Sequence, residues 1–274
     1  MKPQVSVIIL NYNTYQFTYN CIQSIVEKTK GVSYEIIVVD NASPTEDPSG
    51  LKEAFPSINL LLSKENLGFA KGNNWGIQHA NAEYYLLLNN DTLLINDAIT
   101  IAYKKFIEHS QVGVVGAQLQ FPDGTYQHSA QKFPAIKYQL IELFRLQKLF
   151  SAKKRGRFFL GGYFSCEEDV FADWIWGTFF MIKKEVVEKF KDKKLPDDFF
   201  MYGEDFQWGI EIKKIGYKIL FTADPKIIHF AGQSSNDYSA VSLNYFKVIE
   251  KYKGTFYLSL YKLIFRLLKL TTRN

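Results

Sequence analysis

Cysteine is scarce in this sequence, and the two cysteines, Cys21 and Cys166, stand far apart. They form no C-x-x-C pair, and two residues cannot build a disulfide framework. We therefore expect both to be buried free thiols of a protein that works in a reducing compartment, which predicts a cytoplasmic location.

Long apolar runs are also absent. Nowhere do about 20 apolar residues follow one another without interruption, so a membrane-spanning helix is not expected. The N-terminus passes from Met1–Gln4 directly into the β-branched run Val5–Leu10, which is too short for the apolar core of a secretory signal. A protein of this kind that meets a membrane would lie on its surface.

Charge of one sign is not abundant either. The formal net charge of +5 is modest for 274 residues, and we expect no nucleic-acid partner. The basic residues nevertheless cluster in two places, which suits phosphates or anionic lipid. They are Lys153, Lys154, Arg155 and Arg157 in the middle of the chain, and Lys262, Arg266 and Lys269 near its end.

The composition that remains is that of a folded protein, with 47% hydrophobic and 22% charged residues. Three apolar runs of strand length, Val5–Leu10, Tyr34–Val39 and Tyr84–Leu88, alternate with helix-like segments at 18–28 and 70–80. Near-continuously apolar strands that alternate with helices predict an α/β fold, with a mostly parallel sheet covered by helices on both faces.

Polar clusters follow each of the three runs, namely Asn11–Asn13, Asp40–Ser43 and Asn89–Thr92. In parallel sheets ligands bind at the carboxyl ends of the strands, so the three clusters are predicted to converge on one crevice. The alternative is that they form ordinary turns, because Asn, Asp and Ser side chains readily bond to nearby backbone.

The second half of the sequence is less regular. Residues 113–119 predict a strand, and residues 174–182 a strand that leads into a helix at 183–190. The stretch 131–164 predicts a long loop or lid around a helix at 140–149.

Asp91 directly follows the third apolar run, where its carboxylate would project into the crevice. A single hard oxygen ligand suits Mg²⁺ or Mn²⁺, which keep water and take only one or two protein carboxylates. The alternative is that Asp91, followed by Thr92, caps the N-terminus of a helix.

Glu204 and Asp205 are adjacent carboxylates next to an aromatic run. Their mutual repulsion could raise a pKa and produce a general base. The alternative is that they begin a helix at 206–215, where acids favour the first turn. Both interpretations can hold together.

His229 follows the strand-like residues 226–228. An isolated histidine is usually structural, and we interpret His79, His109 and His128 in that way. His229 differs because of the motifs around it.

Six motifs occur in the order typical of a known family. They are Val5–Asn13, Val38–Ser43, Glu65–Asn74, Leu87–Thr92 and the pairs Trp176-Gly177 and Glu204-Asp205. The spacing of His229, Gly232 and Ser234 continues the match as a seventh motif. Over roughly residues 4 to 235 the chain thereby resembles the family 2 glycosyltransferases of GT-A (Rossmann-like) fold, and among them the rhamnosyltransferase-type branch.

The resemblance implies a role for each matching position. The nucleotide-sugar donor would be bound by Tyr12 and Asp40 at its base and ribose, and by Asn66, Gly68, Lys71, Asn74 and Asn90 on the donor and diphosphate side. Asp91 and His229 would bind Mn²⁺ or Mg²⁺. Asp205 would take the proton from the acceptor hydroxyl with support from Glu204, and Trp176 and Gly177 would form the floor beneath donor sugar and acceptor.

Two positions depart from the family pattern. The metal motif is often Asp-x-Asp, but its first position here is Asn89, so one carboxylate must carry the ion unless His229 or water completes the shell. A further acid usually stands two residues after the Glu-Asp pair, where this chain has Gln207 followed by Trp208. The first departure bears on metal dependence and the second on acceptor specificity.

The implied activity is inverting transfer of a sugar from a nucleotide-sugar donor to a growing cell-surface glycan or lipid-linked acceptor. The branch points first to dTDP-rhamnose, then to other dTDP- or UDP-sugars. A nicotinamide-dependent oxidoreductase would share the alternating fold, but no G-x-G-x-x-G follows Val5–Leu10. A catalytically weak or inactive, membrane-associated scaffold of the same fold remains as the alternative.

The expected domains are a GT-A domain over 1–235, with a nucleotide-binding half at 1–105 and an acceptor-binding half at 106–235, and a helical extension over 236–274. Within 256–270 the polar residues Ser259, Lys262, Arg266 and Lys269 form one narrow stripe on a helix that is otherwise apolar. Such an amphipathic tail is predicted to lie on the anionic inner face of the cell membrane. The alternative is that it packs on the domain or on a second subunit of a homodimer.

Overall fold

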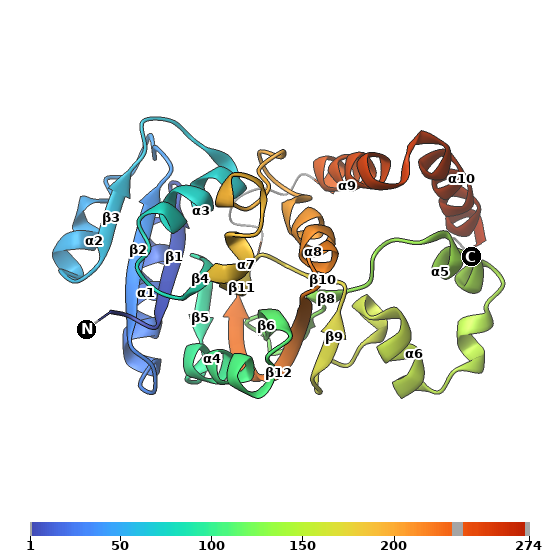
Figure 1. The fold of residues 1–274 in the computed structure, drawn as a ribbon, viewed down its shortest axis with the longest axis horizontal. Coiled ribbons are helices and arrows are strands. Elements are labelled where there is room, and N and C mark those ends of the chain that lie inside the picture. The colour runs from blue at the N-terminus through green and yellow to red at the C-terminus, as the bar shows by residue number, and fades with distance from the viewer. Residues whose placement is uncertain (1, 232–237, 272–274) are drawn as a thin grey trace.

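The computed structural model describes residues 2–231 and 238–271 (Figure 1). Its N-terminal part alternates strands and helices, and the three predicted strands are confirmed as β1, β2 and β4. The elements of this part are β1 (Val5–Asn11), α1 (Tyr15–Lys28), β2 (Tyr34–Asp40), α2 (Ser49–Ala54), β3 (Asn59–Leu62), α3 (Gly68–Gln78), β4 (Tyr84–Asn89), β5 (Thr92–Leu94) and α4 (Ala98–Glu108).

The second part contributes more strands than the sequence predicts. Its elements are β6 (Val112–Gln120), β7 (Tyr126–Gln127), β8 (Ala130–Gln131), β9 (Val170–Ala172), β10 (Trp174–Ile175), β11 (Phe179–Lys183), α7 (Lys184–Val187), α8 (Glu204–Lys214) and β12 (Lys218–His229). The strand predicted at 113–119 is confirmed as β6. The continuous strand predicted at 174–182 is wrong, because residues 176–178 leave the ladder between β10 and β11, and α7 is shorter than the helix predicted at 183–190.

The central sheet has the strand order β3-β2-β1-β4-β11-β6-β12-β5. The pairs β1/β2, β1/β4, β2/β3 and β6/β12 are parallel, which confirms a mostly parallel sheet. Strand β11 is antiparallel to both of its neighbours, β4 and β6. The predicted halves 1–105 and 106–235 therefore share one sheet.

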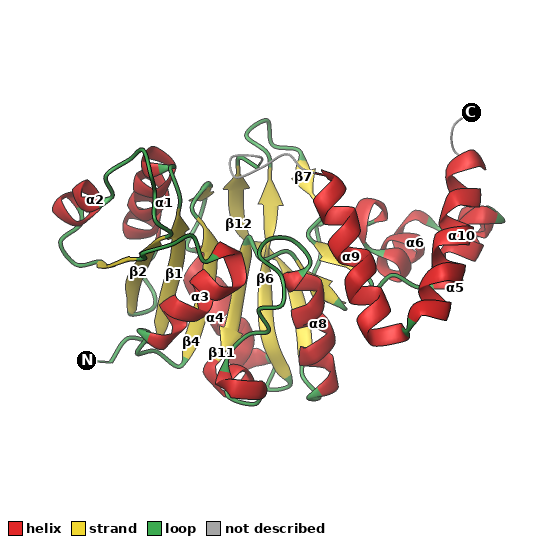
Figure 2. Ribbon diagram, turned by 90° about the horizontal axis from the view of Figure 1, so that it is seen from above, coloured by secondary structure: helices red, strands yellow, loops and turns green. Residues whose placement is uncertain are grey.

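Helices cover both faces of this sheet (Figure 2). Val7 and Ile9 of β1 belong to the buried cluster that includes α1 and α4, whereas Ile8 belongs to the cluster that includes α3 and α8. Alternate side chains of one strand thus enter two separate cores, which explains why the strands are apolar at nearly every position. Cys21 and Cys166 are buried and free, as predicted.

The parallel registers bring the polar strand ends together. Asn11 pairs with Asp40, and Leu10 pairs with Asn89, so β1, β2 and β4 end at the same level. The convergence predicted for the three clusters is confirmed.

Four helices gather at the end of the molecule away from β3 (Figures 1 and 2). They are α5 (Ile136–Leu143), α6 (Ala152–Phe159), α9 (Tyr238–Lys253) and α10 (Thr255–Thr271). The long loop predicted at 131–164 is therefore largely helical. A third core of Trp174, Phe206, Val248, Ile249 and Leu258 joins α9 and α10 to α8 and β10. Within residues 2–231 and 238–271, no helix combines the length and the apolar character needed to cross a bilayer.

Candidate active site

Asp91 lies in the turn between β4 and β5. Strand β5 runs back beside β12, where Thr92 pairs with His229, and this pairing brings His229 Nε2 to 3.4 Å from Asp91 Oδ1. Both side chains are buried. Because a strand follows Asp91, the helix-cap interpretation is wrong, and the cap of α4 is Asp97, whose side chain accepts from the Thr100 N–H.

Gln127, which the sequence did not single out, holds His229 from the other side. Its Nε2 donates to the His229 carbonyl oxygen at 2.7 Å, and its Oε1 lies 2.6 Å from His229 Nδ1. A carbonyl oxygen can only accept, so the amide orientation is fixed and Nδ1 must carry the hydrogen. The other ring nitrogen, Nε2, faces Asp91. It can offer a lone pair to a cation or carry a second proton.

This pair fits a divalent cation. Two acceptor atoms 3.4 Å apart repel each other unless positive charge lies at or between them, either a proton on Nε2 or a metal ion. In the described part of the chain no three His, Cys, Asp or Glu side chains gather into a ligand cage. Asp91 and His229 would thus supply two ligands, and oxygens of a bound ligand and water the rest.

Glu204 and Asp205 form the first turn of α8, so they start a helix and also form a carboxylate pair. Asp205 accepts hydrogen bonds from the backbone N–H groups of Phe206, at 2.8 Å, and of Gly177. Burial nevertheless raises the pKa of Asp205, and burial together with the charge of Asp205 raises the pKa of Glu204. Among the described residues, Glu204 Oε2 has no hydrogen-bond partner. The pair is thus suited to accept a proton.

Helix α9 holds the loop that carries this pair, a function that the sequence did not reveal. Asn244 Nδ2 donates to the carbonyl oxygens of Met201 and Tyr202, at 2.9 and 3.1 Å. Burial raises the pKa of the Tyr245 hydroxyl on the same helix, and the charges of Asp205 and Glu204 add to this effect. The expected helical extension is therefore part of the site.

Gly68 joins the predicted donor side to the loop before α8. Its φ of +74° is left-handed, and a Cβ there would lie 2.3 Å from the Phe200 carbonyl oxygen. That oxygen accepts from the Phe69 N–H at 2.9 Å, and Asn66 Oδ1 accepts from the Gly68 N–H at 2.9 Å. Glycine is required here because two backbone segments touch.

Trp176 and Gly177 lie in the break between β10 and β11. Trp176 is half-buried and contacts two of the three cores. A Cβ at Gly177 would lie 2.9 Å from the Phe69 ring, so this loop also packs against the start of α3. The Thr178 carbonyl oxygen accepts from the Asn89 N–H at 3.0 Å, which links this loop to the end of β4.

Tyr12 and Asp40 follow the ends of β1 and β2. The Tyr12 side chain is 45% exposed. Asp40 is buried, and its carboxylate accepts from Asn11 Nδ2 at 2.7 Å and from the Ser43 hydroxyl and N–H at 2.6 and 3.0 Å. Tyr12 is thus open to a ligand, whereas Asp40 joins the end of β1 to the loop that follows β2.

Two of the predicted donor residues also have structural hydrogen bonds. The Asn74 amide is bound at both ends by the backbone of Leu195, at 2.8 and 2.9 Å. Asn90 Nδ2 donates to the hydroxyls of Thr14 and Thr18, at 2.6 and 2.8 Å. Both amides thus join chain segments, while Asn74 also lines the groove that Lys71 lines. The contact of either residue with a donor remains a prediction.

Lys71 lies on the exposed surface of α3. It lines a groove of about 730 Å³ together with Leu62, Trp75, Gln78 and Lys194, among others. This groove runs between α3, the end of β3 and the loop at 194–197. The contact of Lys71 with a donor remains a prediction.

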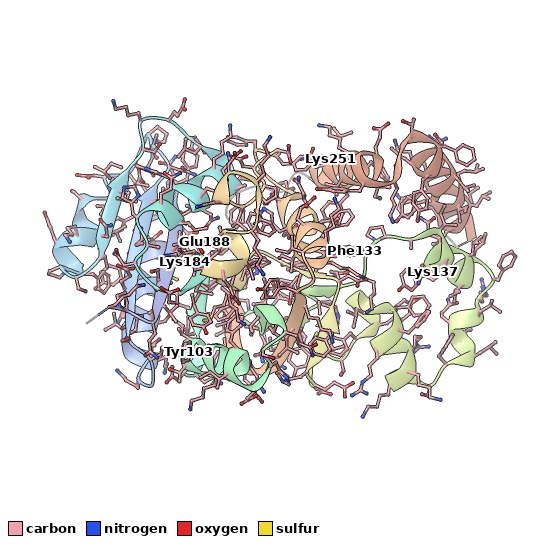
Figure 3. The ribbon with its side chains drawn as sticks, in the orientation of Figure 1. Tyr103, Phe133, Lys137, Lys184, Glu188 and Lys251 are labelled. Carbon is pink, nitrogen blue, oxygen red and sulfur yellow. The ribbon has the colours of Figure 1, made fainter. Side chains whose placement is uncertain are left out.

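Gln207, where the family usually has an acid, connects two helices. Its Nε2 donates to Asp198 and to the Tyr252 hydroxyl. Asp198 also pairs with Lys251 of α9, labelled in Figure 3, at 2.9 Å. Gly232 and Ser234 of the His229 motif lie outside the described residues.

Known proteins agree with this architecture. The O-antigen biosynthesis protein RfbC of Myxococcus xanthus is 23% identical over 85% of this chain, which spans only 18% of that protein. Glycosyltransferase GlyG of Streptococcus pneumoniae is 28% identical over 42% of this chain and 39% of its own length.

Solved structures share the fold at low identity. GalNAc-T7 with UDP, GalNAc and Mn²⁺ matches 91% of this chain and 48% of its own, with a TM-score of 0.64 and 16% identity. The mannosyltransferase PcManGT of Pyrobaculum calidifontis, in complex with GDP-Man and Mn²⁺, matches all of this chain and 77% of its own, with a TM-score of 0.57 and 17% identity. The sequence profile of glycosyl transferase family 2 matches residues 6–190, and the chain therefore belongs to this family.

Proposed function

We propose that this glycosyltransferase moves a sugar from a nucleotide-sugar donor to a glycan acceptor with inversion at the sugar carbon. The main support for the proposal is that one fold contains two carboxylate sites with different surroundings. Asp91 faces His229 at 3.4 Å, and Asp205 begins α8 with a raised pKa. One site suits the charge of a leaving diphosphate and the other suits a hydroxyl proton.

Asp205 is the proposed base. As its carboxylate accepts the acceptor proton, the hydroxyl oxygen attacks the sugar carbon and the nucleoside diphosphate leaves from the opposite side. Direct attack by the acceptor in this way inverts the configuration. The N–H groups of Gly177 and Phe206 hold the base in place, and Glu204 is proposed to support it.

Asp91 and His229 are proposed to hold Mn²⁺ or Mg²⁺. A bound cation would neutralise charge on the departing diphosphate. Support comes from their 3.4 Å separation and from the Mn²⁺ in both similar structures. Tyr12 is proposed to contact the nucleotide base because its ring is exposed beside the crevice.

For the donor we propose dTDP-rhamnose first, followed by other dTDP- or UDP-sugars, on the basis of the branch resemblance. For the acceptor we propose a growing cell-surface glycan or a lipid-linked glycan at the cytoplasmic face of the membrane. The name of RfbC, an O-antigen biosynthesis protein, supports a polysaccharide product.

The test is a thermal-shift screen of nucleotide sugars with and without Mn²⁺, followed by donor hydrolysis assays with the best binder. We expect a Mn²⁺-dependent shift and Mn²⁺-dependent hydrolysis of the same donor. A donor that binds but is never hydrolysed or transferred would favour the inactive scaffold.

A further inference from the structure

Helix α10 presents two different faces. One face packs on the protein, where Leu258 and Ile264 are buried and the Tyr257 hydroxyl accepts from the Ile136 N–H of α5 at 3.2 Å. Helix α10 therefore does pack on the rest of the protein, which was the alternative to membrane contact. It uses only part of the apolar surface of the helix.

The outer face of α10 is an exposed apolar stripe. Its members are Phe256, Leu260, Leu263, Leu267 and Leu270, with exposed fractions of 86%, 38%, 54%, 44% and 68%. They are spaced four, three, four and three residues apart, so they follow one another along one side of the helix. Scattered apolar side chains are normal on a surface, but a continuous row indicates a partner.

A basic stripe runs beside the apolar one. Lys262, Arg266 and Lys269 each directly precede an exposed leucine, and residues 255–271 contain no acidic residue. Lys262 Nζ lies 4.7 Å from the centre of the Phe246 ring. The charged end of this lysine thus lies over an aromatic ring of α9, whereas Arg266 and Lys269 are exposed.

The neighbouring segment has the same character. Phe144 and Leu149, which lie at and beyond the end of α5, are 66% and 82% exposed. Figure 3 labels the basic residue Lys137 on α5, the helix that packs on α10. The whole end of the molecule thus combines exposed apolar and basic side chains.

We propose that the outer face of α10 docks on an anionic phospholipid bilayer. The leucine row would enter the boundary between headgroups and acyl chains, and Lys262 and Arg266 would reach the phosphates. Charge favours this partner over a second copy of the chain. In a symmetric dimer through α10, two basic stripes would approach each other with no acid on either helix.

This proposal rests on the proposed function only in explaining why docking would be useful, namely that it brings the enzyme to a lipid-linked acceptor. Binding itself is measured without any sugar. We would compare co-sedimentation of the full chain with vesicles of phosphatidylcholine alone and of phosphatidylcholine mixed with phosphatidylglycerol, at low and high salt. We expect binding to the anionic vesicles, weakened by salt.

The decisive variant is Leu263→Glu with Leu267→Glu, which places two acids in the apolar row. The matched control is Leu62→Glu with Ile107→Glu, at positions of similar exposure (60% and 68%) on β3 and α4. We expect the first pair to lower partitioning by more than about tenfold and the control pair to keep it. Unchanged thermal midpoints would show that both proteins fold.

Three outcomes would overturn docking. They are no binding of the wild-type protein to anionic vesicles, equal losses in the two pairs, and a solution dimer that Leu263→Glu with Leu267→Glu dissociates. The last outcome would assign the face to a second copy. The wild-type protein could also hydrolyse the donor in a Mn²⁺-dependent manner without binding to vesicles. That result would refute docking and leave the proposed function intact.

Discussion

Asp91 and Asp205 are both aspartates of the candidate active site, but their neighbours differ. Asp91 faces a histidine nitrogen at 3.4 Å, and Gln127 fixes that histidine from behind. Asp205 stands next to another carboxylate, Glu204, and burial raises the pKa of both. The first arrangement holds two acceptors where a cation would be stabilised, and the second makes proton uptake easy. The surroundings of the two identical side chains thus support the two different tasks that we propose for them.

The largest effect is expected at the base. Asp205→Asn keeps the size of the side chain but removes the proton acceptor, and we expect kcat for transfer to fall by roughly 10²–10⁴-fold. Donor affinity should stay within a few-fold, because the base acts on the acceptor. Steady-state kinetics and calorimetry measure both. Wild-type turnover in this variant would remove Asp205 from the mechanism.

Substitutions at Asp91 and His229 should instead weaken donor binding. We expect Asp91→Ala to abolish the Mn²⁺-dependent part of nucleoside diphosphate binding and His229→Ala to reduce it less, because Asp91 brings the negative charge. Titration calorimetry with and without Mn²⁺ separates the two contributions, and Asp205→Asn serves as the control. Equal affinity in the wild-type protein and Asp91→Ala would exclude this aspartate from a metal site.

A smaller effect is expected from the residue behind the histidine. Gln127→Leu removes the acceptor of the His229 Nδ1 hydrogen, and we expect Mn²⁺ affinity to fall by roughly 10–100-fold. Gln127→Glu restores that acceptor and should recover part of the loss. Mn²⁺ binding followed by electron paramagnetic resonance, without donor, provides the measurement. Equal Mn²⁺ affinities of Gln127→Leu and Gln127→Glu would show that Gln127 contributes packing and not a hydrogen-bond acceptor.

The smallest effect concerns pH and stability. Since the pKa of Asp205 is raised, kcat/KM should fall at acid pH around a value above the ordinary aspartate range. Glu204→Gln removes the other carboxyl of the pair, so the acid limb of this variant reports on Asp205 alone.

The same variant tests the burial of Glu204. A raised folded-state pKa means that the folded protein binds the proton more tightly, so stability is lost as pH rises from the unfolded to the folded pKa. Glu204→Gln escapes this loss. We expect its thermal midpoint to match that of the wild-type protein near pH 4 and to exceed it at pH 8. A constant difference across that range would contradict a neutralised Glu204.

Several parts of the fold and site were predictable because they depend on local pattern. The apolar runs at β1, β2 and β4 and the polar residues after them are visible in sequence, and parallel registers follow from the alternation with helices. The turn at Asp91 was less clear. In the sequence alone, an aspartate that binds a metal cannot be told from one that caps a helix. The strand β5, which begins directly after Asp91, excludes the helix cap.

Other parts depended on segments far apart in the chain. Gln127 and His229 are separated by 102 positions, and Asn74 and Leu195 by 121. The sequence shows an asparagine in a family motif but not which backbone its amide meets. The structural hydrogen bonds of Asn74 and Asn90 were therefore not foreseen, and Gln127 and Asn244 were missed.

The sequence by itself determined the strands β1, β2, β4 and β6, the helices α1, α3 and α8, the convergence of the polar strand ends and the basic stripe of α10. Each of these follows from the period of apolar and polar residues. Tertiary structure decided that β11 enters antiparallel between β4 and β6, which amides support the site, and which face of α10 stays exposed. These depend on the surfaces that meet when distant segments pack together, and a surface becomes buried only when its partner is in place.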